Sequence, residues 1–351
     1  MFTRLAPEQH DTLDGIPEPS ENPRLVGHAA VAGQLAAAYR TGKLPHAMLF
    51  SGPQGIGKAT AAYHLAYHLL RHPDHRTAPD MLEVPDPGSS LFRQIASGAH
   101  PSVLHLTRPQ AERAGSGFKS ALTVDEVRKV GRFVSHTSHD GSYRVVIVDP
   151  ADDMNINAAN ALLKNLEEPP SRTVFILIAH ALGRLLPTIR SRCQVVRFTP
   201  LVDAELISVL EGFDIGLPQD ETARRQLVMD ASGSARTAIL LSQYGGLDIG
   251  QALDRLVRSA GTPGSEAHRL AEAVTGKDRA VQFALFNDRV LEILSDAATA
   301  AAREARLARA ERISSAWQEM RIAIGEAETY NLDRKQHALN MILRLHDTLR
   351  M

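Results

Sequence analysis

At residues 52–58 the chain reads Gly52-Pro53-Gln54-Gly55-Ile56-Gly57-Lys58, between the apolar run Ala47-Met48-Leu49-Phe50 and a stretch with helical periodicity over 58–71. Glycines let successive backbone N–H groups turn toward a phosphate, the lysine reaches its oxygens, and the following helix N-terminus adds partial positive charge. A strand, a glycine-rich loop and a helix, in that order, form the context that a phosphate-binding loop requires. The sequence therefore predicts nucleotide binding at Gly52, Gly55, Gly57 and Lys58, against the alternative of a purely structural glycine turn.

The loop departs from the usual pattern on the metal side. The position after the lysine needs a hydroxyl for Mg²⁺, but Ala59 stands there and Thr60 follows one residue late, about 100° around the helix. Asp149 ends the apolar run 145–148 and could orient Mg²⁺ through water, but the next residue, Pro150, can do no acid–base work. We expect that ATP can bind but is weakly used, and that Mg²⁺ can bind only without its normal coordination.

The chain alternates apolar runs with helical patterns, which predicts an α/β fold with a parallel sheet. After Pro200 the strand patterns stop and helical patterns continue. We predict a loosely ordered segment at 1–22, a P-loop core at 23–200, a small helical lid at 201–248 and a helical region at 249–351. The expected strands and helices of the core are 47–50, 103–106, 145–148, 174–178 and 195–198, and 26–39, 58–71, 123–134 and 152–168.

Composition limits the function classes. The 351 residues carry 39 Lys+Arg against 40 Asp+Glu, a net charge of −1, so the chain is a poor candidate for gripping nucleic acid alone, although a local basic patch stays open. The single cysteine, Cys193, excludes a disulfide framework and a Cys-based zinc cluster. No apolar run approaches the length of a membrane span, and a cytoplasmic protein is predicted.

Several further motifs identify a family resemblance. These are His46-Ala47-Met48-Leu49-Phe50, Asp149-Pro150-Ala151, Asn160-Ala161-Leu162-Leu163-Lys164, Leu166-Glu167-Glu168-Pro169 and Leu186-Pro187-Thr188-Ile189-Arg190-Ser191-Arg192-Cys193. Over about residues 23–240 the chain resembles bacterial DNA polymerase III clamp-loader subunits. Asp-Pro-Ala in place of Asp-Glu-Ala is similar to the delta prime type rather than to the gamma/tau ATPase. The resemblance implies an AAA+ core, a helical lid and a helical C-terminal collar for oligomerisation.

The resemblance also implies roles for two arginines. Arg192 would be an arginine finger that acts in trans on ATP held by a neighbouring subunit, because its planar guanidinium suits developing phosphate charge. Arg236, in Ser232-Gly233-Ser234-Ala235-Arg236, would be the second sensor, which contacts the γ-phosphate. A plain surface arginine is the alternative reading at both positions. His180 stands at a further sensor position, where the family often has Asn.

The implied partners are gamma/tau and delta subunits in a hetero-pentamer, the sliding clamp and, through the complex, primed DNA, with no membrane. Own ATP hydrolysis would be negligible, which leaves open whether the chain is itself an enzyme. Two alternatives stay open: an active ATPase of the gamma/tau type, and an unrelated P-loop nucleotide-binding enzyme. Ala59 and Pro150 speak against the first, and Ser191-Arg192-Cys193 is unexplained by the second.

Some polar residues receive plainer interpretations. Residues 89–101 lack cysteine where family members often carry a zinc module, so no zinc is expected. His64, His68, His72 and His75 are expected to form a solvated polar face, although neighbouring pairs at i, i+4 could bind a metal. Asp152 and Asp153 are expected to cap the helix that follows them.

Overall fold

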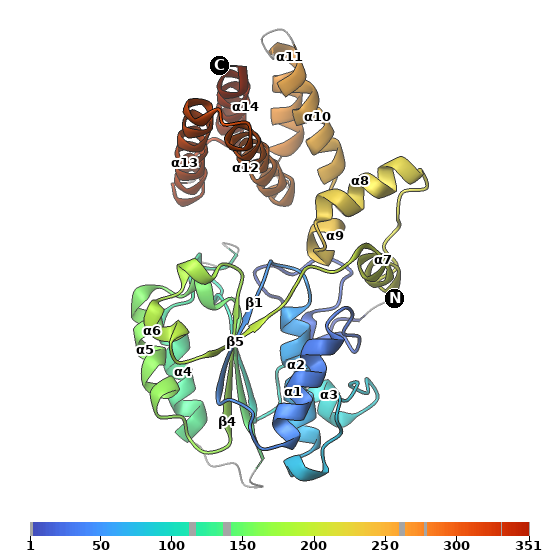
Figure 1. The fold of residues 1–351 in the computed structure, drawn as a ribbon, viewed down its shortest axis with the longest axis vertical. Helices are drawn as coiled ribbons and strands as arrows, with labels where there is room; N and C mark the ends of the chain where they lie inside the picture. The colour runs from blue at the N-terminus through green and yellow to red at the C-terminus, as the bar shows by residue number, and fades with distance from the viewer. Residues whose placement is uncertain are drawn as a thin grey trace. The chain divides into compact units, whose positions relative to one another are not determined.

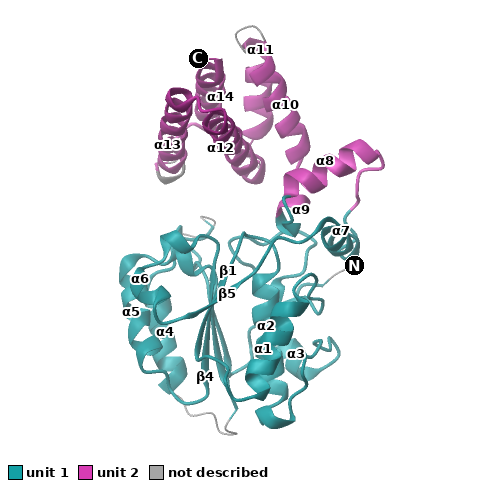
Figure 2. Ribbon diagram, in the orientation of Figure 1, with its two compact units in different colours: residues 1–215, 232–236 teal, residues 216–231, 237–351 magenta. Residues whose placement is uncertain are grey.

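The structure is a computed structural model that describes residues 3–111, 117–135, 142–259, 264–276, 279–330 and 332–350. It has two compact units, which are coloured separately in Figure 2. Unit 1 comprises Met1–Ile215 and Ser232–Arg236, and unit 2 comprises Gly216–Ala231 and Thr237–Met351. Among the described residues, no helix is both long and apolar enough to cross a membrane.

Unit 1 is built on a five-stranded sheet in the order β2-β3-β4-β1-β5, with every neighbouring pair parallel. Strands β1, β3 and β4 are almost wholly buried, as expected of a parallel sheet that is covered on both faces. The predicted α/β fold with a parallel sheet is confirmed. The strands are β1 (Ala47–Ser51), β2 (Val103–Leu106), β3 (Arg144–Val148), β4 (Thr173–Ala179) and β5 (Gln194–Arg197).

Helices cover both faces of this sheet (Figure 1). Alternate side chains of β1 serve the two layers: Met48 and Phe50 pack in one core, and Ala47 and Leu49 in the other. The first core contains residues of α1 (Ala29–Arg40), α2 (Lys58–Arg71) and α3 (Ser90–Ala96). The second contains residues of α4 (Val124–Ser135), α5 (Ile156–Glu167) and α6 (Pro187–Arg190). Unit 1 also holds α7 (Asp203–Gly212) and the short 3₁₀ helices η1 (Pro19–Glu21), η2 (His75–Thr77), η3 (Ala151–Asp153) and η4 (Leu182–Arg184).

Helix α3 was not expected from the sequence. Its N-cap, Ser89, accepts a hydrogen bond from the Phe92 backbone N–H at 3.1 Å. Phe92 and Ile95 are buried against α2, so a seven-residue helix is stabilised by packing rather than by its length.

The described part of unit 2 is helical, which confirms the predicted helical C-terminal region. Its core contains Phe286, Val290, Leu294, Ile313 and Met320. The helices are α8 (Glu221–Ala231), α9 (Ala235–Gln243, whose first two residues belong to unit 1), α10 (Gly246–Arg258), α11 (Gly264–Val274), α12 (Ala280–Arg303), α13 (Leu307–Thr329) and α14 (Arg334–Arg350). The structure gives two compact units where the sequence predicts three domains, and α7 stays with unit 1; the boundaries at 200 and 248 stay predictions.

The N-terminal segment differs from its expectation. Residues 1–22 were predicted to be loosely ordered, but Ala6, Leu13 and Ile16 are buried, as are the polar side chains of Glu18 and Glu21. The segment is held by hydrogen bonds between residues far apart within it, which hydrophobic periodicity does not reveal.

Candidate nucleotide site

The parallel sheet gathers three of the predicted positions at one edge. Ser51 pairs with Ala179, and Val148 pairs with Leu177, so β1, β3 and β4 end at nearly the same level. Gly52, Asp149 and His180 therefore follow these strands at the carboxyl edge of the sheet, where open α/β folds bind their ligands.

The lysine of the loop is engaged by its own loop. Lys58 Nζ donates to the backbone carbonyl of Gly52 at 2.7 Å and to that of Pro53, and the residue is only 3% exposed. Burial lowers the pKa of Lys58 to about 8, and the carboxylates of Asp149 and Asp152 oppose that shift. The Lys58 ammonium group could bind a phosphate, but here it is hydrogen-bonded to two backbone carbonyls of its own loop.

The loop is clamped by the stretch that contains Arg236. Ser234 Oγ donates to the Gln54 carbonyl at 2.8 Å, and the Ala235 backbone N–H donates to the Gly55 carbonyl at 3.0 Å. Gly55 has φ +74°, and a Cβ there would lie 2.3 Å from Arg236 Cβ. The structure thus brings Arg236 to the loop, as predicted, although its contact with a phosphate stays a prediction.

The side chain of Arg236 has a partner that sequence reasoning missed. Its Nη1 donates to the backbone carbonyl of Asp11 and lies 3.7 Å from Asp11 Oδ2. Burial, followed by the charge of Asp11, raises the pKa of Asp149 to about 7. No sequence signal marks Asp11, because it lies in a segment without periodicity.

The residues at the carboxyl edge fit the phosphates of a nucleotide better than they fit its Mg²⁺ ion. The glycines and Lys58 fit a phosphate, whereas Mg²⁺ would find Asp149 but no hydroxyl at Ala59, and Thr60 is buried. Among the described residues no group of three or more His, Cys, Asp or Glu is placed to hold a metal ion. If ATP binds here, Lys58 and the loop backbone would hold its phosphates.

The acidic residues after Asp149 do not cap the next helix, so that prediction is wrong. Asn155 caps α5, with its side chain accepting from the Ala158 N–H at 2.9 Å. The Asp152 carboxylate instead accepts the N–H groups of His180 and Ala181, both at 3.1 Å. Burial, followed by the charge of Lys58, lowers the pKa of His180 to about 4, so this imidazole is neutral at pH 7. His180 therefore faces the site without a charge of its own.

Arg192 lies apart from this cluster, just after α6. Its guanidinium donates to the Thr188 carbonyl at 3.0 Å and forms an ion pair of 2.6 Å with Glu167 at the end of α5. The Arg192 side chain is 37% exposed and that of Glu167 is 48% exposed. An exposed pair of this kind contributes at most about 1 kcal/mol, so it leaves the guanidinium able to exchange its partner.

Comparison with known proteins follows the same part of the chain. A family model described as DNA polymerase III, delta subunit matches residues 27–202, half of the chain. This chain belongs to that family. The resemblance to clamp-loader subunits that its motifs indicate is thereby confirmed.

Individual members of the DNA polymerase III group match over comparable stretches. Subunit delta' of Pseudomonas aeruginosa is 39% identical over 202 residues, which cover 57% of this chain and 56% of that protein. Subunit delta' of Bacillus subtilis is 37% identical over 162 residues, 45% of this chain and 44% of that protein. Subunit tau of Bacillus subtilis is 33% identical over 200 residues, 54% of this chain and 33% of that protein. The chain thus spans about half, or less, of the length of each of these relatives.

The prediction of a solvated polar face is wrong for His64 and His68 of α2. His64 is 4% exposed and His68 is fully buried, because η1, α1 and α3 pack against α2. His64 Nε2 is hydrogen-bonded to the Asn22 carbonyl at 2.9 Å, and His68 Nδ1 accepts from the Glu83 N–H at 3.2 Å. Both imidazoles therefore lie between α2 and its neighbours rather than on a solvated face.

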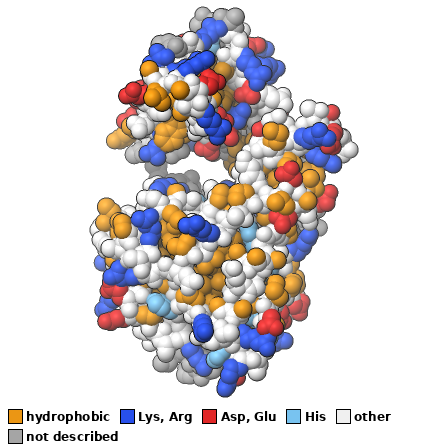
Figure 3. Space-filling view, in the orientation of Figure 1, with side chains coloured by type: hydrophobic (Ala, Val, Ile, Leu, Met, Phe, Trp, Pro, Cys, Tyr) orange, Lys and Arg blue, Asp and Glu red, His pale blue; other side chains and the backbone are white. Residues whose placement is uncertain are grey.

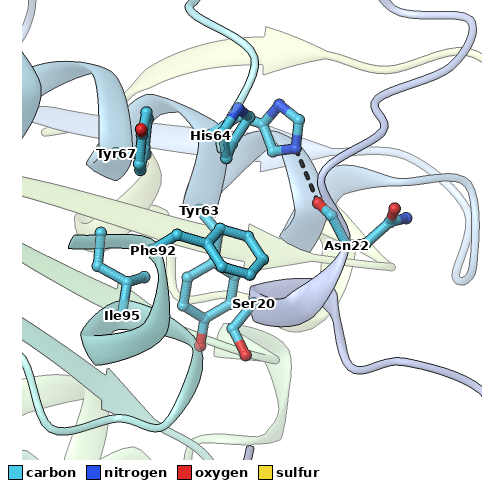
Figure 4. A pocket seen from close by; sticks show the side chains of 8 residues that line it. Ser20, Asn22, Tyr63, His64, Tyr67, Phe92 and Ile95 are labelled. Atoms are coloured by element: carbon cyan, nitrogen blue, oxygen red, sulfur yellow. Dashed lines mark hydrogen bonds between the residues drawn. The ribbon is translucent and has the colours of Figure 1, made fainter. Parts of the chain in front are cut away.

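A small pocket lies beside His64 (Figure 4). It is lined largely by aromatic and apolar side chains, among them Tyr63, Phe92 and Ile95. The one hydrogen bond drawn there joins His64 to the backbone of Asn22. Its lining contains no lysine, arginine or carboxylate, so it offers no charge to a phosphate or a metal, and the candidate site stays at the carboxyl edge of the sheet.

The face of unit 1 that Figure 3 shows carries charges of both signs. On the face drawn in Figure 3, Lys and Arg side chains are interspersed with Asp and Glu over unit 1. This mixture agrees with the net charge of −1. It gives no reason to expect that unit 1 alone grips DNA through this face.

Proposed function

We propose that this chain acts as a delta prime-type subunit of a DNA polymerase III clamp loader. It would assemble with gamma/tau and delta subunits in a hetero-pentamer and help ATP-dependent loading of the sliding clamp onto primed DNA. Residues 249–351 would form the collar of that assembly. The chain's own hydrolysis is negligible, and its contribution to the reaction is the trans-acting guanidinium of Arg192.

One contrast carries this proposal. Lys58 is buried and donates to its own loop, and Ala59 offers no metal ligand. Arg192, by contrast, is exposed, donates to the Thr188 carbonyl and has an exposed ionic partner in Glu167. A site without the metal hydroxyl loses charge stabilisation that phosphoryl transfer needs. A planar, permanently charged guanidinium at the surface can still supply that stabilisation to phosphate held by another chain.

The alternative is an active ATPase of the gamma/tau type. The 33% identity to a tau subunit favours it, because that match covers a similar stretch of this chain. Pro150 after Asp149, with no carboxylate in its place to polarise water, speaks against it. A P-loop enzyme unrelated to this family is set aside by family membership.

The test is reconstitution of the complex with gamma/tau, delta, the clamp and primed DNA. We expect Arg192→Ala to leave assembly intact but to reduce hydrolysis at the adjacent site steeply, since arginine fingers contribute about 10³–10⁵ in rate in GTPases. Total hydrolysis falls less, because other sites continue to turn over. Arg192→Lys should rescue little, because an ammonium lacks the planar fork.

Two matched variants complete the experiment. Arg190→Ala removes an exposed arginine two residues away and should leave clamp loading within about twofold of normal. Lys58→Met keeps most of the side-chain volume and should likewise leave hydrolysis by the complex nearly unchanged. Normal clamp loading with Arg192→Ala, or loss of hydrolysis with Lys58→Met, would overturn the proposed division of roles.

A further inference from the structure

The N-terminal residues 3–21, here called the N-terminal strap, fold back on themselves. Arg4 Nη1 donates to Glu18 Oε1 at 2.6 Å, and Arg4 Nη2 donates to the Leu13 carbonyl at 2.8 Å. Glu21 Oε1 accepts the N–H of Ala6 at 3.1 Å. Charge-assisted hydrogen bonds from buried or half-buried side chains therefore give the strap a defined shape.

The strap is also attached to the rest of unit 1 at two well-separated points. Ser20 Oγ donates to the carbonyl of Ala96, at the end of α3, at 3.2 Å. His10 Nδ1 lies 3.3 Å from Thr107 Oγ1, which directly follows β2. The strap thus crosses from α3 to the carboxyl edge of the sheet.

Between these attachments the strap places Asp11 against Arg236, whose backbone contacts the phosphate-binding loop. The Arg236 backbone N–H donates to the Gly55 carbonyl at 3.4 Å, and its side chain contacts the Asp11 carbonyl and carboxylate. The charge of Asp11 also contributes to the raised pKa of Asp149, after burial. A carboxylate therefore stands among the groups that an incoming phosphate would meet.

We propose that the N-terminal strap competes with phosphate at the loop of residues 52–58. Asp11 gives Arg236 a negative partner and repels a second anion, so a nucleoside triphosphate binds well only when the strap lifts. The Asp11 carboxylate of the strap would thus occupy the place of a phosphate next to Arg236 until the strap is displaced. This inference rests on the proposal that the loop can bind phosphate, and it is independent of the role of Arg192.

Calorimetric titration of the full chain with ATP and Mg²⁺ tests this competition. Asp11→Asn removes the carboxylate charge and keeps the backbone carbonyl that Arg236 contacts. Taking the repulsion as worth one pKa unit, we expect its Kd for ATP to fall about tenfold. Asp14→Asn makes the same chemical change at an exposed position of the strap and should stay within about twofold of the unsubstituted protein. The double variant Asp11→Asn, Lys58→Met should bind ATP as weakly as the unsubstituted protein.

A second measurement follows the strap itself. The N–H groups of Leu5 and Ala6 are bonded to Glu21, and saturating ATP should accelerate their hydrogen exchange as the strap opens. Arg4→Ala, which removes the main internal anchor, should tighten ATP binding in the same direction as Asp11→Asn.

The contrary outcomes are equally definite. Equal affinity of Asp11→Asn and Asp14→Asn, whether both bind or neither does, would overturn the competition, as would unchanged exchange at Leu5 and Ala6 when ATP is bound. These measurements test the competition between the strap and phosphate, whereas hydrolysis by the complex with Arg192→Ala tests the proposed function. Either proposal can therefore fail without the other.

Discussion

The phosphate-binding loop and the turn after α6 hold their positive charges in opposite ways. Lys58 is 3% exposed and donates to two carbonyls of its own loop, and Arg236 beside it contacts Asp11. Arg192 is more than a third exposed, and its ionic partner, Glu167, is more exposed still. Cations that are buried and internally bonded are expensive to redirect, whereas an exposed pair exchanges partners cheaply. Under the proposed function, the first region receives a nucleotide poorly and the second acts on a nucleotide held by a neighbouring subunit.

The largest effect on this comparison is expected from Gly55→Ala. A left-handed residue costs about 1–2 kcal/mol, and a Cβ 2.3 Å from Arg236 Cβ adds overpacking of similar size, so the free energy of unfolding should fall by about 3 kcal/mol. Gly15→Ala is the control, because it has φ +72° with no atom within 4 Å of the added Cβ, and it should cost only about 1 kcal/mol. Denaturant unfolding measures both, and equal losses would mean that the loop is not clamped.

Acid should weaken unit 1 in a predictable direction, because burial keeps three of its histidines neutral. Burial lowers the pKa values of His68, His105 and His180 to about 4, whereas in the unfolded chain they lie near 6.5. Between these values the unfolded chain binds protons that the folded chain excludes, so stability is lost as the pH falls from about 6.5 toward 4. Each histidine contributes up to about 1.4 kcal/mol per pH unit.

The raised pKa of Asp149 acts in the opposite direction. Its folded pKa is about 7, so its contribution is present at low pH and is lost as the pH rises from about 4 through 7. Unfolding in urea at pH 5, 6 and 7 should show a net fall with acid that is shallower in His68→Gln. An unaltered slope in that variant would contradict the buried, neutral state of His68.

The smallest effect is expected from Glu167→Gln. Removing the ionic partner of Arg192 should change the free energy of unfolding by less than about 1 kcal/mol, because both side chains are substantially exposed. Glu168→Gln supplies the matched change one residue away. A loss of 2 kcal/mol or more in Glu167→Gln alone would show that Arg192 is held as firmly as Lys58, and the contrast between the two regions would disappear.

Much of the fold and of the loop could be predicted because their signals are local. The helix Lys58–Arg71 has the predicted bounds, since the glycine-rich loop fixes its start and apolar periodicity its extent. The strand Val103–Leu106 also has its predicted bounds, which follow from a short, largely apolar run. The N-terminal strap could not be predicted, because its order depends on contacts such as Arg4 with Glu18 and Arg236 with Asp11. The burial of the histidines of α2 could not be predicted for a related reason. A helix that is enclosed on several sides has no solvent-exposed face, so its polar residues do not mark one. The roles of Arg192 and Arg236 stay predictions.

The glycines of the loop have a consequence for how such sequences are read. A Cβ at Gly52 would lie 2.5 Å from the Phe198 carbonyl oxygen, and one at Gly55 would collide with Arg236. Both positions thus exclude larger residues for reasons internal to the protein, whether or not a nucleotide ever enters. Selection on folding alone would preserve these two glycines in a lineage that had abandoned ATP. In this chain the two glycines are therefore explained by the packing of the loop alone, independently of nucleotide binding.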